Sequence, residues 1–303
     1  MSLGKMVLLL LIVFALLCPL SAIAQEEEIL IGLIPEMNVF SQMERFKALG
    51  DYITEKTGIK IHFTILSRYG NIINTFEGKK LDGAFFGSFT GAMAVAKLDL
   101  EPLARPVNLD GLSTYHGLLF VRKDSGIRNI KGMKGKRMAF VERATTAGYL
   151  FPIAYLKEHG VTKINNFFRE HYYSGSHDAA IYAVLNREAD IGAAKNTIYN
   201  IIKQKQPRID KELLILAESP KVPSNGLCVR KSMPDWMKKK LKETLLNIDK
   251  DKKGQEALKK FYALGFIETT ASDYRPVFEL AEKAGIDIKN YEYMNKEEEN
   301  NKK

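Results

Sequence analysis

The segment RMAFVERATTAGYLFPIAYLKEHG, residues 137–160, decides the fold of this chain. Its first part, Arg137–Glu142, is predicted to be a β-strand, and its last part, Tyr149–His159, is predicted to be an α-helix. A further strand is predicted downstream, at Phe168–Tyr173. A strand, a helix and a strand in this order are typical of a parallel sheet with crossover helices.

The same order of elements is predicted nearer the N-terminus. Strands are expected at 29–34, 60–66 and 82–86. A helix lies between the first two strands, because Ser41 and Glu44 have the spacing of a capping box and Gly58 can end the helix. A shorter helix is expected at about 70–76.

Residues 76–84 (FEGKKLDGA) and 185–193 (LNREADIGA) form a weak internal repeat. Each copy contains the end of a predicted helix, a polar turn, an Asp and a strand of small and apolar residues. The repeat indicates two similar α/β lobes. The apolar segment His116–Arg122 is suited to a strand that crosses between them, and a second crossing is predicted near Ala217–Val222.

Beyond Pro223 the sequence changes to Lys-rich helices, predicted at about 235–248 and 255–264. Four lysines of the first helix suggest a nucleic-acid patch: Lys238, Lys239, Lys240 and Lys242. A solvated face opposite the leucines of this helix explains them more simply, and no nucleic-acid partner is expected. The last residues, 295–303, are predicted to be a disordered tail.

The N-terminus predicts export to the periplasm. Lys5 precedes the apolar run Met6–Leu17, which is too short to span a membrane, and the small residues Ser21–Ala24 follow. This pattern is typical of a secretory signal peptide, here residues 1–24, cleaved after Ala24. A lipid anchor on Cys18 is the alternative, and it has less support because a leucine precedes this cysteine.

Composition and charge exclude several classes of protein. The chain has 303 residues, of which 46% are hydrophobic and 27% are charged, and these values exclude global disorder. The net charge of +9 suits an anionic ligand or surface without naming one. Cleavage after Ala24 would leave Cys228 as the one cysteine, so that the exported chain can form no internal disulfide.

The sequence carries no motif of a familiar enzyme class. It contains no GxGxxG, P-loop, HExxH or paired CxxC motif. The five histidines lack ligand spacing on one face, so that neither a metal nor another cofactor is expected. Ser176, His177 and Asp178 are the residue types of a catalytic triad, but adjacent residues cannot converge as nucleophile, base and orienting acid. We therefore expect no enzyme.

Two polar loops follow predicted strands and favour an anion site. In the first, Thr145 and Thr146 offer hydroxyls and backbone N–H groups at a helix N-terminus, where the helix dipole favours an anion. Gly148 permits close approach of this backbone to a ligand. In the second loop, Ser176 is expected to cap a helix that begins at His177, whose ring can donate to an anion and would be protonated in the complex.

The alternatives are purely structural roles: an ordinary threonine cap in the first loop and a half-exposed cap residue in the second. Against them stands the position of the loops, because ligands of parallel α/β sheets bind at the carboxyl ends of the strands. Both loops follow such ends.

With these loops, the chain resembles the phosphate-, phosphite- and phosphonate-binding periplasmic proteins of ABC transporters, in the type II solute-binding superfamily. The resemblance extends in order from about residue 29 to residue 290. It is carried by the segments 32–35 (GLIP), 121–127 (VRKDSGI), 135–141 (GKRMAFV), 147–152 (AGYLFP), 175–180 (GSHDAA), 219–223 (SPKVP) and 227–231 (LCVRK).

The resemblance implies an α/β fold with two lobes that close over a ligand like a clamshell. Each lobe would be a mostly parallel sheet flanked by helices, with the ligand cleft between the lobes. The first lobe would be discontinuous, with residues 25–117 and 220–294, and the second would comprise residues 118–219. The two chain crossings would form the hinge.

The resemblance also implies ligand-binding residues in the second lobe. Thr145 and Thr146 stand where the family has hydroxyl side chains on the phosphonate oxygens, and Gly148 matches the glycine of that loop. Ala147 lacks the hydroxyl that the family has at its position. His177 corresponds to the histidine that donates to the anion.

In the first lobe, Tyr69 corresponds to an aromatic residue of the family's pocket. Ser88 lies in a loop, GSFTG, in which a second pocket tyrosine is absent. Asn225 replaces an Asp that can pair with the amine of a ligand, and the loop 195–197 (KNT) also lacks an acid. A buried ligand ammonium would lack a partner, so the sequence favours phosphate, phosphite or a phosphonate with an uncharged tail.

We therefore expect the periplasmic solute-binding component of an ABC importer, which passes a small phosphorus oxyanion to a membrane permease and works as a monomer. One alternative is the same fold acting as a ligand sensor for a membrane sensor kinase. A second is the binding of another small anion, for which the change at Ala147 leaves room.

Overall fold

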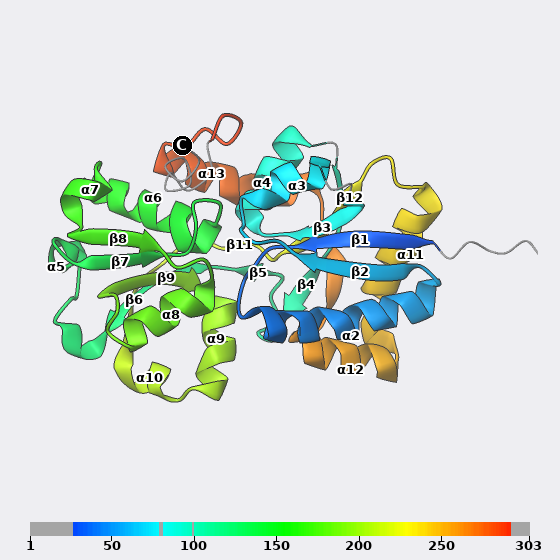
Figure 1. The fold of residues 1–303 in the computed structure, drawn as a ribbon, viewed down its shortest axis with the longest axis horizontal. Helices are drawn as coiled ribbons and strands as arrows, with labels where there is room; N and C mark the ends of the chain where they lie inside the picture. The colour runs from blue at the N-terminus through cyan, green and yellow to red at the C-terminus, as the bar shows by residue number, and fades with distance from the viewer. Residues whose placement is uncertain (1–26, 79–80, 99, 292–303) are drawn as a thin grey trace, which may run out of the picture.

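The computed structural model describes residues 27–78, 81–98 and 100–291 (Figure 1). The predicted signal peptide 1–24, with Cys18 and the cleavage site at Ala24, and the predicted tail 295–303 lie outside the described residues. Within the described ranges, no helix combines the length and the apolar character needed to cross a membrane.

A six-stranded sheet lies in the half of the molecule on the right of Figure 1. Its strand β1 (Glu28–Leu33) pairs in parallel with β2 (Lys60–Ile65) and with β3 (Gly83–Phe86). Antiparallel pairing extends the sheet through β12 (Gly226–Arg230), β4 (Leu100–Asn108) and β13 (Ala263–Glu268). The strand order is β13-β4-β12-β3-β1-β2.

A five-stranded sheet lies in the other half and follows the same plan. Strand β7 (Arg137–Phe140) pairs in parallel with β8 (Glu170–Tyr173) and with β9 (Ile191–Lys195). Two antiparallel strands follow, β6 (Gly117–Arg122) and β10 (Leu213–Glu218). Each sheet is therefore mixed: a parallel core of three strands is extended on one side by antiparallel strands.

The weak internal repeat of the sequence is also a repeat of structure. The Asp82 carboxylate accepts the N–H of Leu30 in β1 at 2.8 Å, and the Asp82 N–H donates to the Leu30 carbonyl at 2.9 Å. In the other sheet, Asp190 makes the same two bonds with Arg137 of β7, at 2.8 and 3.0 Å. Each Asp thus fixes a β-strand beside the central strand of its parallel core.

Two short segments connect the halves. Strand β5 (Thr114–Tyr115) pairs antiparallel with β11 (Val222–Pro223) in a two-stranded ribbon. The segment 116–122, predicted to cross between the lobes, lies instead almost wholly in β6 of the five-stranded sheet. The chain crosses just before this segment. The apolar residues of β6 are all buried within the five-stranded sheet, so β6 does not extend into the other half.

Helices cover both faces of each sheet (Figure 1). The six-stranded sheet packs on one face against α2 (Val39–Thr57), α11 (Asp235–Leu246) and α12 (Lys252–Phe261), and on the other against α3 (Asn71–Gly78) and α4 (Ser88–Lys97). The five-stranded sheet packs on one face against α8 (His177–Leu185), α9 (Asn196–Lys205) and α10 (Arg208–Glu212), and on the other against α6 (Phe151–Glu158). The short helices are α5 (Ile130–Met133), α7 (Ile164–Phe167) and the single turns η1 (Lys123–Ser125), η2 (Thr146–Leu150, a π-turn), η3 (Ile248–Lys250) and η4 (Ala271–Tyr274).

Two local predictions were wrong. Helix α2 begins at Val39 because Asn38 caps it, accepting the N–H groups of Phe40 and Ser41, so the capping box at Ser41 does not form. Gly58 ends the helix in the left-handed conformation, as predicted. The helix predicted to reach residue 264 ends at Phe261, and the residues after it form the edge strand β13.

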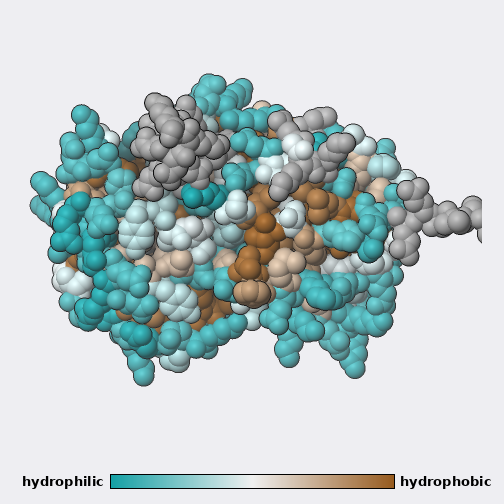
Figure 2. All heavy atoms as spheres, in the orientation of Figure 1, coloured by the Kyte–Doolittle hydropathy of each residue, from teal (hydrophilic) through white to brown (hydrophobic). Residues whose placement is uncertain are grey.

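The last helix, α13 (Arg275–Ala284), packs against elements of both halves. It contacts α6 beside the five-stranded sheet and α4 beside the six-stranded sheet. Lys283 pairs with Glu158 of α6 at 3.2 Å. One hydrophobic cluster runs through both halves at this side, with Phe89, Phe151 and Leu280 among its members. On the face shown in Figure 2, polar side chains predominate and apolar ones gather near the centre.

Candidate functional site

The loops at the carboxyl ends of β1, β3, β7 and β9 meet in one small cavity between the two sheets. It has about 10 Å³ of free volume, room for about one water molecule. Its walls are formed by Ile34, Glu36, Tyr69, Gly87, Ser88, Phe89, Tyr115, Ala144, Thr145, Thr146, His177, Lys195 and Asn225. Six of the seven residues that the sequence singled out are therefore brought together, and Gly148 is not among them.

The loop between β7 and α6 presents Thr146 to the cavity. Thr146 is buried, and its hydroxyl lies beside the Tyr115 hydroxyl without a well-directed hydrogen bond. Thr145 also lines the cavity, but its hydroxyl donates to the Glu142 carbonyl at 2.6 Å. The first hydrogen bonds of the π-turn come from Leu150 and Phe151, so the N–H groups of residues 146–149 precede them.

Gly148 has a packing role. A Cβ atom at this position would lie 2.3 Å from Cβ of Val141 and 2.7 Å from Oγ1 of Thr145. The Gly148 carbonyl accepts the Val141 N–H at 3.1 Å. The glycine therefore lets the start of the helix approach the end of β7. The sequence predicts instead that Gly148 lets the backbone approach a ligand.

His177 is the first residue of α8, and Ser176 caps this helix as predicted. The N–H of Lys195 donates to Nδ1 of His177 at 3.3 Å, so that the ring carries its proton on Nε2. Burial, with a smaller contribution from Lys195 and against the opposing effect of Glu36, lowers the pKa of His177 to about 3. Without a bound anion, His177 therefore offers a neutral Nε2–H donor to the cavity. The expectation that the ring is protonated concerns the complex and stays a prediction.

Tyr69 is the second donor that the cavity leaves without a partner. Its hydroxyl is buried and makes no hydrogen bond, and its ring meets the His177 ring edge-on at 6.0 Å. Its backbone N–H donates to the Glu142 carboxylate at 3.1 Å, which fixes the residue across the two halves. Burial raises the pKa of Tyr69 well above its usual value, so the hydroxyl keeps its proton.

The hydroxyls of Ser88 and Tyr115 are hydrogen-bonded to each other. The Ser88 hydroxyl lies 2.7 Å from the Pro223 carbonyl and 2.8 Å from the Tyr115 hydroxyl. A serine hydroxyl has one proton and a carbonyl can only accept, so Ser88 donates to Pro223 and Tyr115 donates to Ser88. The Ser88 side chain thus holds the linker ribbon in place, and its proton is not free for a ligand.

Sequence reasoning missed a buried ion pair on the cavity wall. Nζ of Lys195, from the end of β9, lies 2.9 Å from Oε1 of Glu36, from the loop after β1. The same ammonium donates to Oδ1 of Asn225 at 3.0 Å and lies 4.4 Å from the centre of the Tyr115 ring. The signal was available, because Glu36 and Lys195 both follow predicted strands at their carboxyl ends.

The electrostatics of the cavity favour an anion. Burial raises the pKa of Glu36, but Lys195 and Arg45 outweigh burial and the net shift is downward, so that the carboxylate is ionised and balances Lys195. Helices begin at three residues of the wall: Ser88, Thr146 and His177. Their N-terminal N–H groups add positive partial charge to a cavity whose side chains are neutral in sum. Across the described ranges, no group of three or more His, Cys, Asp or Glu residues could hold a metal ion.

The two halves touch around the cavity. The His177 N–H donates to the Glu36 carbonyl at 3.1 Å, and the Asn38 N–H donates to the Asp178 carboxylate at 2.8 Å. The Glu36 loop is braced from behind by Gln42, whose side chain accepts the Glu36 N–H at 2.9 Å and donates to the Ile34 carbonyl. The site is therefore closed in this structure.

Known proteins share this sequence pattern and this fold. The family described as "ABC transporter, phosphonate, periplasmic substrate-binding protein" matches residues 31–274. The phosphonates-binding periplasmic protein of Escherichia coli (strain K12) is 24% identical over 270 residues, which cover 88% of this chain and 79% of that protein. A probable phosphite-binding protein of an ABC transporter from Prochlorococcus marinus (strain MIT 9301) is 24% identical over 265 residues, which cover 84% of this chain and 88% of that protein.

Solved structures show the same fold. The binding-protein component of an ABC phosphonate transporter from Pseudomonas aeruginosa superposes with a TM-score of 0.80 at 22% identity, over 91% of this chain and 93% of that one. The Prochlorococcus protein in complex with methylphosphonate superposes with a TM-score of 0.75 at 24% identity, over 86% and 99%. The fold is the two-lobed clamshell of type II periplasmic binding proteins. With the sequence match over most of its length, the chain belongs to the family of periplasmic substrate-binding proteins of ABC phosphonate transporters.

Proposed function

We propose that this chain binds a small phosphorus oxyanion, such as phosphate, phosphite or methylphosphonate, in the cavity between its lobes and passes it to the permease of an ABC importer. The expected lobe bounds are residues 25–117 with 220–294, and residues 118–219, and in the structure Gly117 already pairs within the five-stranded sheet. One observation carries the proposal: the hydroxyls of Tyr69 and Thr146 are buried on the cavity wall without hydrogen-bond partners. Buried donors normally have partners, so their positions fit the oxygens of a bound anion.

The donors surround the cavity from both lobes. Thr146 and the N–H groups that follow it, Nε2–H of His177 and the Tyr69 hydroxyl would each contact an oxygen of the anion. Thr145, Ser88 and Asn225 line the wall, and their polar groups already bind other residues. We assign to these three the shaping of the cavity, and to Gly148 the packing of the loop.

The relatives support a phosphorus oxyanion without fixing which one. Family members carry names that specify phosphonates, phosphite and, in a protein of Mycolicibacterium smegmatis that is 28% identical over 180 residues, phosphate import. The small cavity favours a compact anion, and the lobes must part slightly even for this, because the closed cavity has room for about one water molecule. Phosphite and phosphonates carry three oxygens on phosphorus and phosphate carries four, and Tyr69, Thr146 and His177 with the backbone N–H groups after Thr146 offer donors to several of them.

Calorimetric titration of the chain with phosphate, phosphite, methylphosphonate and sulfate tests the proposal. We expect binding of at least one phosphorus oxyanion and a weaker response to sulfate. Thr146→Ala should weaken that binding about tenfold or more, because a hydrogen bond to a charged group contributes roughly 1.5–3 kcal/mol. Thr57→Ala is the matched control: this buried threonine donates to Ile53 far from the cavity, so its loss should lower Tm and leave affinity unchanged.

Unchanged affinity in Thr146→Ala would remove this loop from the site. The partner is tested in cells that lack the chain. Lost uptake of the labelled anion supports the importer, whereas normal uptake with altered transcription supports a sensor kinase. Gel filtration of the purified chain checks the expected monomer, and peptide mapping of the exported chain checks cleavage after Ala24.

A further inference from the structure

Lys195 occupies a cage that is built to hold an ammonium group. Its three walls are the Glu36 carboxylate at 2.9 Å, the Asn225 amide oxygen at 3.0 Å and the face of the Tyr115 ring at 4.4 Å. An ammonium has three N–H groups, and a carboxylate, an amide oxygen and an aromatic face are what a primary ammonium needs when it is taken out of water. We call these three residues the ammonium cage.

The cage lies on the wall of the anion cavity and is filled from within the chain. Glu36 and Asn225 belong to one lobe, and Lys195 enters from the other, at the end of β9. Lys195 and Glu36 are both 7% exposed as side chains, so the ion pair is largely buried. Glu36 is the one acidic residue among the described residues that line the cavity, and its charge is already balanced.

We propose that Lys195 serves as a built-in ammonium and so determines specificity: it makes the site select phosphorus oxyanions that carry no amino group. This inference rests on the proposed function and names the ligand class within it. A ligand such as 2-aminoethylphosphonate would bring its own ammonium next to Lys195. It would then share one carboxylate with a second cation, in a cavity that contains no other acid.

Lys195 also forms a partition between two cavities. A larger pocket of about 330 Å³ lies on the other side of Glu36, Lys195 and Asn225, between α2 and α9. The same three residues line both spaces. Removing the lysine side chain would therefore empty the cage and extend the small cavity toward the larger pocket, giving a ligand with an aminoalkyl tail both room and a counter-ion.

The partition also changes what Asn225 can do. An Asp at position 225 would add a carboxylate, and the sequence alone suggests that this change admits an amine. In the structure the new carboxylate would lie against Lys195, whose ammonium still fills the cage. Asn225→Asp is therefore expected to leave 2-aminoethylphosphonate excluded, and Lys195→Ala is expected to admit it.

The test titrates four proteins by calorimetry: wild type, Lys195→Ala, Lys195→Met and Asn225→Asp. The ligands are methylphosphonate, 2-aminoethylphosphonate and propylphosphonate, which has a tail of the same length as the amine but no charge. We expect the wild type to bind 2-aminoethylphosphonate about 100-fold more weakly than methylphosphonate, and Lys195→Ala to gain about tenfold or more for the amine. In Lys195→Ala, the affinity for propylphosphonate should rise less than that for the amine. In Lys195→Met, which fills the space without charge, the affinity should rise for neither ligand.

Lys205→Ala is the matched control, an exposed lysine at the far end of α9 whose loss should change no affinity. Two results would overturn the role of Lys195 while the proposed function stands. In both, Lys195→Ala binds methylphosphonate, but its affinity for the amine either does not rise or rises no more than its affinity for propylphosphonate. If the wild type binds none of the phosphorus oxyanions, the proposed function itself fails. If Lys195→Ala does not fold, Glu36→Gln decides instead. Its unpaired Lys195 should then bind methylphosphonate more tightly, and a tenfold loss would overturn the proposal.

Discussion

His177 shows how one backbone donor fixes the protonation state of a buried side chain. The Lys195 N–H occupies Nδ1, which leaves the proton on Nε2, and burial then opposes a second proton. Without this contact, a histidine at this position would be expected to become protonated when an anion binds. In the chain without ligand, the contact therefore leaves His177 as a neutral donor through Nε2.

The first prediction concerns this histidine and the stability of the fold. The pKa of His177 is about 3 in the folded chain and near 6.5 when unfolded, so the unfolded chain binds more protons between these values. Stability should fall as pH drops below about 6.5, by several kcal/mol in total at pH 3 to 4. His177→Gln lacks this titration. The Tm of wild type minus that of the variant should therefore shrink from pH 7 to pH 4, and a constant difference would contradict a neutral buried ring.

At the scale of elements, the short π-turn η2 joins β7 to α6 and positions the loop that carries Thr145 and Thr146. The turn can lie this close to the strand because position 148 has no side chain. Its first carbonyls, from Thr145 and Thr146, accept the N–H groups of Leu150 and Phe151. The geometry of the loop thus depends on packing behind it as much as on the residues that face the ligand.

Gly148→Ala tests that packing. The added methyl would overlap Val141 and Thr145, and overpacking of a well-filled core costs about 1–3 kcal/mol. We expect a lower Tm together with weaker anion binding, because the loop must move. Gly132→Ala is the control: its added Cβ would meet nothing closer than 3.4 Å, so Tm should stay nearly the same. Normal stability of Gly148→Ala would show that the loop has more room than the structure indicates.

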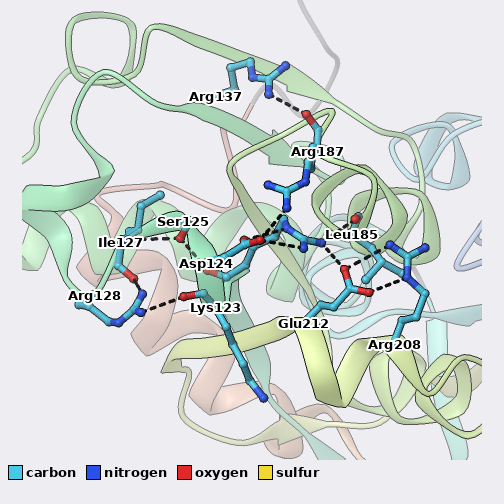
Figure 3. A network of polar contacts seen from close by, with 11 residues as sticks. Lys123, Asp124, Ser125, Ile127, Arg128, Arg137, Leu185, Arg187, Arg208 and Glu212 are labelled. Carbon is cyan, nitrogen blue, oxygen red and sulfur yellow. Dashed lines mark hydrogen bonds and ion pairs between the residues drawn. The ribbon is translucent and has the colours of Figure 1, made fainter.

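A second element-scale feature is the ion network at the end of β6 (Figure 3). Arg122 donates to Asp124 at 3.0 Å, to Glu212 at 2.5 Å and to the Leu185 carbonyl at 2.8 Å, so it ties together β6, α8 and α10. Arg187 also binds Asp124, and Arg208 also binds Glu212. Hydrogen bonds from Arg122 and Arg187 lower the pKa of Asp124 to about 2, and those from Arg208 and Arg122 lower the pKa of Glu212 to about 2.

The network predicts a loss of stability in acid. Both carboxyl pKa values are depressed on folding, so their contribution is complete above about pH 4.5 and is lost as pH falls toward 2. Arg122→Met should lower Tm at pH 7, and the gap to the wild type should narrow below pH 4. Thermal melts of both proteins from pH 7 to pH 2 measure this gap. Arg187→Ala, an exposed partner of Asp124, should have a smaller effect.

At the scale of the whole molecule, the two lobes must separate to admit a ligand. The cavity is closed by contacts between the halves, among them His177 with Glu36 and Asn38 with Asp178. The ribbon of β5 and β11 connects the halves, and we expect the movement to occur about it. Helix α13 lies across both halves and limits the movement on its side.

Small-angle X-ray scattering tests this movement. We expect a larger radius of gyration for the chain without ligand than with a saturating phosphorus oxyanion, and the value with ligand should match the closed structure. Asp178→Asn weakens a contact between the two halves, from the Asn38 N–H to the Asp178 carboxylate, so we expect it to lower anion affinity more than it lowers Tm without ligand. Identical scattering with and without the bound anion would contradict opening of the lobes.

The sequence by itself determined the elements and the family. The strands around 29–34 and 137–142, the helix end at Gly58, the helix start at Ser176 and the order of strands and helices follow from periodicity and capping, which act between neighbours in the chain. The same local patterns placed Thr146 and His177 after strand ends, the family resemblance added Tyr69, and the structure brings these three together in one cavity.

The tertiary structure alone decided the chemistry of the site. Glu36 and Lys195 are 159 residues apart, and no local pattern encodes their contact. The same holds for the tautomer of His177, for the packing role of Gly148, and for the pairing of Ser88 with Tyr115 and Pro223. Each depends on which side chains the two lobes bring face to face when they close, and that is a property of the assembled fold rather than of any one segment.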